Sequence, residues 1–166
     1  MISACCVRLI DLGTQLGTPS GANSAKRLIA VGWELLDSYR SDHELPTIVY
    51  NVYVLEFSLL APLRRDIEQW FGGALTLGLS QRFDLKSLLG RYGFIEAAQG
   101  APDTLRRWVI HPFTGNADAK RCLRPVTPLE QFMAASPDIE LLETLPHELQ
   151  TLIKASPEFI ASQQND

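Results

Sequence analysis

Two strand-like runs, residues 94–99 and 105–111, flank the segment GAPDT at residues 100–104. Gly, Pro and Asp are residues that tight turns require, and short runs with aromatic and β-branched residues favour strands. The pattern predicts a β-hairpin that carries two adjacent arginines, Arg106 and Arg107, close to its turn. Because an isolated hairpin is only marginally stable in water, this one needs other elements to pack against.

The two long segments before the hairpin have apolar residues at helical spacing. In residues 26–41 these residues recur three or four positions apart, which places them on one helical face and predicts a helix. Residues 46–61 show the same spacing after Pro46, a residue tolerated in a first helical turn. The β-branched residues of this segment also permit a strand, and we predict a helix from its length.

Two shorter helices are predicted between these segments and the hairpin. Pro62 opens a helix that Gly72 and Gly73 end. Ser80 can cap a further helix within residues 79–91, so the simplest interpretation is helix, turn, helix and then hairpin.

Helices are also predicted after the hairpin. Thr127, Pro128 and Glu130 form a capping-box signature at the start of one, and residues 137–155 predict another that is broken or kinked at Pro146. The predicted fold class is therefore mostly α with a short β-hairpin (α+β), a winged helix-turn-helix with flanking N- and C-terminal helices.

The predicted elements divide the chain into three parts. Residues 11–25 are rich in Gly, Ser, Thr and Pro, and residues 1–25 are predicted to be an irregular N-terminal arm. The winged-helix domain is expected over residues 26–125 and a C-terminal helical extension over residues 126–166.

Charge is unevenly distributed along the chain. The formal net charge is -4, yet residues 60–125 contain ten Lys or Arg against six Asp or Glu. This central part therefore carries +4 and the rest of the chain -8. Such segregation favours a basic working surface on an otherwise acidic body.

Other features exclude several classes of protein. No run approaches the roughly 18 apolar residues that cross a bilayer, and no secretory signal is evident, so a cytoplasmic protein is expected. The histidines lack metal-ligand spacing, and no nucleophile or phosphate-loop motif is present, so we expect no metal, no cofactor and no catalytic residue. The odd number of cysteines suits a reducing compartment, with redox sensing as the alternative for Cys5, Cys6 and Cys122.

The predicted order of elements over roughly residues 26–117 resembles the MarR family of winged-helix transcription regulators. The segments LRRDIEQWFG and LSQRFDLKSLLGRYGFIEAA are similar to the helix before recognition and to the recognition helix running into the wing. The wing is the most similar part, because Asp103, Arg106 and Arg107 are followed by Thr114 and Gly115. Three departures are the spacing of Asp103 and Arg106, which is one residue wider than usual, the longer connection GGALTLG, and Phe113 where the family usually has Leu.

The resemblance implies a homodimer, built from the N- and C-terminal helices, that binds double-stranded DNA as a sequence-specific regulator. Residues 79–91 would enter the major groove, and the wing at residues 94–111 would reach the flanking minor groove. The resemblance also allows a small-molecule effector. The candidate DNA-binding residues are Arg64, Arg65, Ser80, Gln81, Arg82, Lys86, Arg106 and Arg107.

Each candidate also has a plainer interpretation. Arg82 and Lys86 suit base edges and phosphates but also suit a solvated helix face, and Ser80 suits a helix cap. Arg64 and Arg65 suit backbone phosphates or ion pairs with neighbouring acids.

The tryptophans have two interpretations as well. Trp33, Trp70 and Trp108 suit an effector pocket or the core, with the core favoured.

A rival function remains open for the whole chain. The protein could be a non-catalytic interaction module, an accessory or assembly subunit of a larger complex, that never meets DNA. Its contact surface would be the acidic helices or the apolar stripe over residues 49–60.

Overall fold

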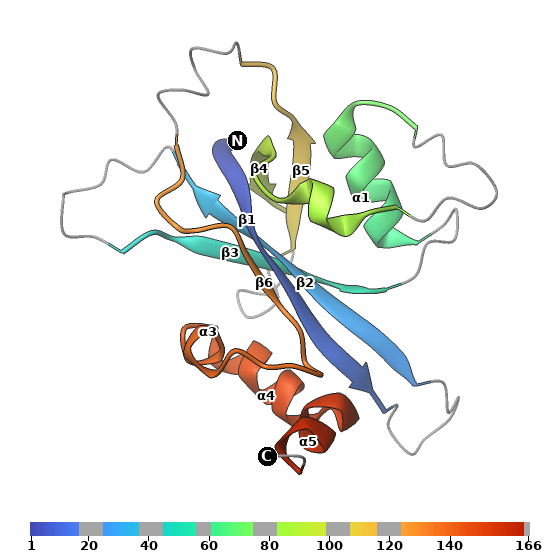
Figure 1. Ribbon diagram of the computed structural model, residues 1–166. Helices are drawn as coiled ribbons and strands as arrows, with labels where there is room; N and C mark the ends of the chain where they lie inside the picture. The colour runs from blue at the N-terminus through green and yellow to red at the C-terminus, as the bar shows by residue number, and fades with distance from the viewer. Residues whose placement is uncertain are drawn as a thin grey trace.

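A computed structural model describes residues 1–16, 25–36, 45–55, 61–74, 83–98, 107–115 and 124–164. In this part of the chain a six-stranded sheet carries helices on both of its faces (Figure 1). The strands are β1 Ile2–Gln15, β2 Lys26–Leu35, β3 Ile48–Val54, β4 Tyr92–Ala97, β5 Trp108–Pro112 and β6 Glu130–Phe132. The helices are α1 Pro62–Phe71, the 3₁₀ helix η1 Leu85–Leu88, α3 Ile139–Glu143, α4 His147–Ala155 and α5 Pro157–Gln163.

The sheet is organised around β1, in the order β3-β2-β1-β4-β5, with β6 parallel to β1. β1, β2 and β3 form an antiparallel meander, and β4 returns to lie beside β1. This is a Greek-key arrangement. The 14-residue β1 shifts register against β2 between Cys6 and Arg8 and again between Asp11 and Gly13. Such bulges bend a strand, so β1 pairs with β4 over its first part and with β6 farther along.

The sheet curls until its two outer strands nearly meet. The Nδ2 of Asn51 on β3 donates to the carbonyl oxygen of Trp108 on β5 at 2.7 Å. The backbone N–H of Trp108 donates back to the Oδ1 of Asn51 at 2.9 Å. One side chain therefore spans the seam between β3 and β5, and the five antiparallel strands form a partly open barrel.

Two hydrophobic cores share the sheet. The inner core fills the barrel and is closed by α1 and η1, with the ring centroids of Trp33 and Trp70 6.0 Å apart. The outer core lies on the opposite face of β1 and β2 and is covered by the C-terminal helices, with Leu149 and Ile153 of α4 buried (Figure 1).

The predicted mostly α, winged helix-turn-helix fold is wrong. Most of the helix expected over residues 26–41 is the strand Lys26–Leu35, and the helix expected over residues 46–61 contains the strand Ile48–Val54. The residues of β2 from Ile29 to Trp33 are apolar or Gly because the strand is buried on both faces, so no polar alternation marks it as a strand.

Three further expectations are also wrong. Most of the N-terminal arm that we expected to be irregular is the strand β1, Ile2–Gln15. Where we expected a recognition helix, residues 83–91 contain only η1 and a turn. The capping-box signature at Thr127 precedes β6, because the strand takes its partner from β1. Residues 17–24 of the arm and 79–82 of the expected helix lie outside the described residues. The part boundaries near residues 25 and 125 stay a prediction.

Other expectations are confirmed. Helix α1 begins at Pro62 and ends before Gly72, whose φ of 72° suits a residue without a Cβ. β4 and β5 pair as an antiparallel hairpin within residues 94–111, although they belong to the barrel instead of forming a wing. The C-terminal helix is broken at Pro146, between α3 and α4.

The Asn51 seam gives a test of this fold. Replacing Asn51 with Ala leaves the N–H and carbonyl of Trp108 without their partner, so we expect the free energy of unfolding to fall by about 1–3 kcal/mol. Urea unfolding followed by circular dichroism measures this. The control is Gln69→Ala, which removes an exposed amide and should change stability by no more than about 0.5 kcal/mol. Equal stability of the two variants would contradict a structural role for the seam.

Candidate functional site

The structure places the predicted DNA-binding arginines in separate surroundings. Arg107, at the start of β5, makes two contacts of 2.9 Å with the carboxylate of Asp66 on α1. Arg64 pairs with Glu68 one turn along α1 at 3.0 Å, which confirms the ion-pair interpretation for this residue. Arg65 is exposed on α1, and Lys86 is exposed on η1. Ser80, Gln81, Arg82 and Arg106 lie outside the described residues.

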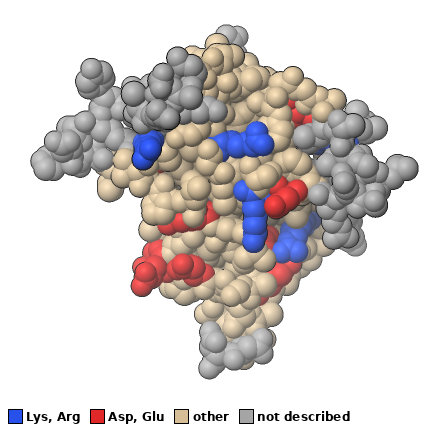
Figure 2. Space-filling view, turned by 45° about the horizontal axis from the view of Figure 1, so that its top comes forward, with Lys and Arg blue, Asp and Glu red and all other residues tan. Residues whose placement is uncertain are grey.

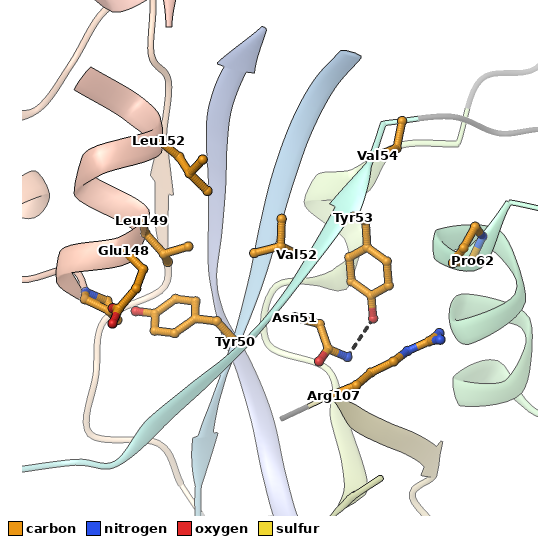
Figure 3. A pocket seen from close by; sticks show the side chains of 11 residues that line it. Tyr50, Asn51, Val52, Tyr53, Val54, Pro62, Arg107, Glu148, Leu149 and Leu152 are labelled. Carbon is orange, nitrogen blue, oxygen red and sulfur yellow. Dashed lines mark hydrogen bonds between the residues drawn. The ribbon is translucent and has the colours of Figure 1, made fainter. Parts of the chain in front are cut away.

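A groove of about 660 Å³ follows β3 (Figure 3). Side chains of β3 point toward both walls of the groove. Tyr50 lies toward α4, whereas Asn51 and Tyr53 lie toward Arg107 and α1. Most of the lining is apolar. The groove is lined by Tyr50, Asn51, Val52, Tyr53, Val54, Pro62, Arg107, Pro146, Glu148, Leu149 and Leu152.

Polar groups beside this groove are already engaged. The Tyr50 hydroxyl accepts from Nη1 of the nearly buried Arg8 at 3.1 Å, and Nε of Arg8 contacts Glu130 at 2.6 Å. The Tyr53 hydroxyl donates to Asp66 at 2.9 Å, and its burial and the nearby Asp66 carboxylate raise the pKa of Tyr53. These tyrosines are therefore neutral structural groups, and the charged side chains in the lining of the groove are Arg107 and Glu148.

A second surface combines aromatic rings with a cation. We define the aromatic–arginine surface as Phe71, Arg91, Tyr92, Phe94 and Phe113. The rings of Phe94 and Phe113 stack with centroids 5.2 Å apart, and Tyr92 lies 5.7 Å from Phe113. The guanidinium carbon of Arg91 lies 4.0 Å from the centroid of Phe71. The four aromatic residues are half-buried and Arg91 is exposed.

A hollow of about 280 Å³ lies within this second surface. Its lining contains Phe71, Arg91, Tyr92 and Phe113, together with Trp70, Gly90 and Pro112. Stacked aromatic rings beside an arginine are the groups that hold planar, negatively charged ligands.

Local structure explains why these rings face outward. Successive side chains of a strand alternate between faces, so Gly93 and Ile95 of β4 face the inner core while Tyr92 and Phe94 face out. The indole N–H of Trp70 donates to the carbonyl of Tyr92 at 2.9 Å. A Cβ at Gly93 would lie only 2.7 Å from that indole nitrogen, so the glycine permits the contact.

The cations near this surface are only weakly engaged. Arg91 donates from Nε to the carbonyl of Ser87 at 3.1 Å, and neither Arg91 nor Lys86 forms an ion pair with another described residue. On the face that Figure 2 draws, the described Lys and Arg side chains lie singly or in small groups, with Asp and Glu among them. The site therefore combines the exposed Arg91 with half-buried aromatic rings.

Sequence reasoning missed the aromatic–arginine surface, although part of its signal was present. Tyr92 and Phe94 are two residues apart where the predicted helix gives way to the predicted hairpin, and in a strand this spacing puts both rings on one face. Phe113 was considered only as a departure from a family pattern. The core interpretation is confirmed for Trp33 and Trp70, and Trp108 packs against the same inner core.

No protein-family model matches the chain, and comparisons with curated proteins and with solved structures also find no match. They therefore neither support nor oppose the MarR resemblance. In the part of the chain that the structure describes, no helix is long and apolar enough to cross a membrane. No group of three or more His, Cys, Asp or Glu in these same ranges could hold a metal ion.

The cysteines of β1 are poor candidates for redox sensing. Cys5 and Cys6 are buried, and burial together with the nearby Glu34 carboxylate raises the pKa of Cys5 to about 12. Burial also raises the pKa of Cys6. Since the thiolate is the reactive form, neither thiol is activated at neutral pH. Cys122 lies outside the described residues.

Alkylation tests this assignment. In a Cys122→Ser background at pH 8, iodoacetamide should label Cys5 and Cys6 far more slowly in the native protein than in urea, as mass spectrometry would show. The pKa of Cys5 is about 12 in the folded protein and about 8.5 in the unfolded chain. Above pH 8.5 the unfolded chain therefore loses this proton more readily than the folded protein does. The contribution of Cys5 to the free energy of unfolding is complete below pH 8.5 and is lost as pH rises toward 12. Rapid labelling of the native protein would contradict the burial of both thiols.

Proposed function

We propose that the protein binds single-stranded nucleic acid on the aromatic–arginine surface and is not an enzyme. The observation that carries this proposal is the stack of Phe94, Phe113 and Tyr92 beside the exposed Arg91. Every nucleobase has a planar face that can stack on such rings, and stacking contributes about 1–3 kcal/mol per base. The guanidinium of Arg91 supplies a cation for a phosphate of the same strand.

The architecture supports the proposal. A partly open, five-stranded Greek-key barrel with a helix between its third and fourth strands has the arrangement of an OB-fold, which binds oligonucleotides and oligosaccharides in many proteins. In that fold the face of the second and third strands is the usual site. Here the C-terminal helices cover the outer face of β1 and β2, with Leu149 and Ile153 of α4 buried. Exposing each such side chain costs about 2–3 kcal/mol, so an open aromatic surface is the better candidate.

The net charge is compatible with this proposal. Residues 126–166 contain seven Asp or Glu and one Lys, so the preceding 125 residues together carry +2. Phosphate contacts supply much of nucleic-acid affinity, and a weakly basic barrel predicts modest affinity that depends on salt. Stacking then supplies the remaining part of the binding free energy.

Other functional expectations stay predictions. A role as a regulator of double-stranded DNA, a cytoplasmic location, a small-molecule effector and a homodimer are all compatible with a binding protein. Helix-turn-helix readers insert a helix in the major groove, and residues 83–91 supply only a single 3₁₀ turn for this purpose. This geometry therefore favours a single strand over a duplex.

The proposal is tested by fluorescence anisotropy over a series of salt concentrations. The two labelled ligands are a 20-nucleotide oligothymidine and a DNA duplex of equal length. We expect the single strand to bind more tightly and its affinity to fall as salt rises. Phe113→Leu removes a stacking ring but keeps an apolar side chain, so we expect a loss of about 5- to 150-fold, equivalent to 1–3 kcal/mol. Arg91→Glu should weaken binding and reduce the salt dependence.

Lys154→Glu is the matched control because it makes the same charge change at an exposed position of α4. It should leave the affinity near that of the parent. Absence of binding at low salt would overturn the proposal. Equal losses for Arg91→Glu and Lys154→Glu would show that only net charge matters. Binding of an uncharged oligosaccharide without salt dependence would instead assign the surface to carbohydrate.

A further inference from the structure

The outward face of the β4–β5 hairpin continues past the aromatic rings to a polar pair. Residues directly opposite each other in an antiparallel ladder share one face, and His111 of β5 is opposite Phe94 of β4. Glu96 lies two residues beyond Phe94 in the strand and is therefore on the same face. The Nε2 of His111 lies 3.2 Å from Oε1 of Glu96. The side chain of Glu96 is 47% exposed, so its carboxylate is accessible from solvent beside Phe94.

The stack with Phe113 determines which face of the Phe94 ring can receive a base. The centroids of these two rings are 5.2 Å apart and their planes differ by 19°, so Phe113 covers one face of Phe94. Phe113 lies toward the Tyr92 end of the strand, since its ring is also 5.7 Å from that of Tyr92. The opposite face of Phe94 is therefore directed toward Glu96. A base stacked on that face has its edge beside the carboxylate.

The position of Glu96 suits a base edge and not a phosphate. A carboxylate repels phosphate, and the cation of this surface, Arg91, is separated from Glu96 by about 17 Å of strand at roughly 3.4 Å per residue. An ionised carboxylate can accept about four hydrogen bonds through its two oxygens. His111 contacts only Oε1, and Oε2 has no hydrogen bond to another described residue. Glu96 therefore keeps room for two donors that lie side by side.

We propose that Glu96 makes this surface selective for guanine, an inference that rests on the proposed binding of single-stranded nucleic acid. Guanine alone among the standard bases has two adjacent donors, N1–H and the N2 amino group, on its Watson–Crick edge. Adenine and cytosine have an acceptor next to their amino group, and thymine and uracil have one donor between two carbonyls. A carboxylate therefore accepts two hydrogen bonds from guanine and meets a repelling acceptor on each of the other bases.

This form of recognition requires an unpaired strand. In a duplex the Watson–Crick edge of guanine is bonded to cytosine, whereas an unstacked base of a single strand exposes it to side chains. The aromatic rings and Glu96 then have separate tasks. The rings hold any base by its face, and the carboxylate distinguishes the base by its edge.

Fluorescence anisotropy with the full chain tests the selectivity. The labelled 20-nucleotide strands are oligothymidine and alternating copolymers of thymidine with deoxyguanosine, deoxyadenosine or deoxyinosine. We expect the guanosine strand to bind about 5- to 150-fold more tightly than the adenosine strand, equivalent to 1–3 kcal/mol for a bidentate base contact. Deoxyinosine lacks the N2 amino group, so its strand should lose much of this gain.

One variant and its matched control assign the selectivity to Glu96. Glu96→Gln keeps the size of the side chain but replaces one acceptor oxygen with an amino group, so the preference for guanosine over adenosine should be lost. Oligothymidine should bind this variant at least as tightly as the parent, because a negative charge is removed. Glu143→Gln makes the same change at an exposed position of α3 and should keep the preference. Circular dichroism confirms that both variants are folded.

The outcomes separate this inference from the proposed function. Binding of oligothymidine by the parent without a preference for the guanosine strand would overturn the selectivity and leave the binding function standing. A preference that persists in folded Glu96→Gln would overturn the assignment to Glu96. Absence of binding to every strand at low salt would overturn both proposals.

Discussion

The whole structure depends on one strand being buried on both faces. β1 supplies Leu9 to the inner core and Ile10 and Leu12 to the outer core, and it also pairs with β2, β4 and β6. Two register shifts bend it, which allows the sheet to curl until Asn51 reaches Trp108. Loss of β1 would therefore remove both cores and the barrel together.

The aromatic–arginine surface is a consequence of how the inner core packs. Trp70 holds the carbonyl of Tyr92, and the absence of a side chain at Gly93 leaves room for the indole. With its inward positions filled by core residues, β4 presents Tyr92 and Phe94 outward to meet Phe113. The proposed binding function thus rests on positions that the core sets, and the cation Arg91 adds the charge that a nucleic-acid strand requires.

The C-terminal helices restrict where ligands can bind. By covering the outer face of β1 and β2 they leave a groove lined by β3 and α4. The predicted interaction module and the predicted homodimer stay predictions.

The sequence by itself determined where several elements begin and end. Pro62 and Gly72 mark the ends of α1, and Pro146 separates α3 from α4. The hairpin within residues 94–111 follows from the turn-forming residues between its strands. These features depend on local backbone restrictions, so neighbouring residues suffice to specify them. Only the tertiary structure decided that Lys26–Leu35 and Ile48–Val54 are strands. Their apolar spacing fits a helix as well as a strand buried on two faces, and the choice is made by hydrogen bonds to strands distant in the sequence. The aromatic–arginine surface was equally hidden, because its rings come from segments that the barrel brings together.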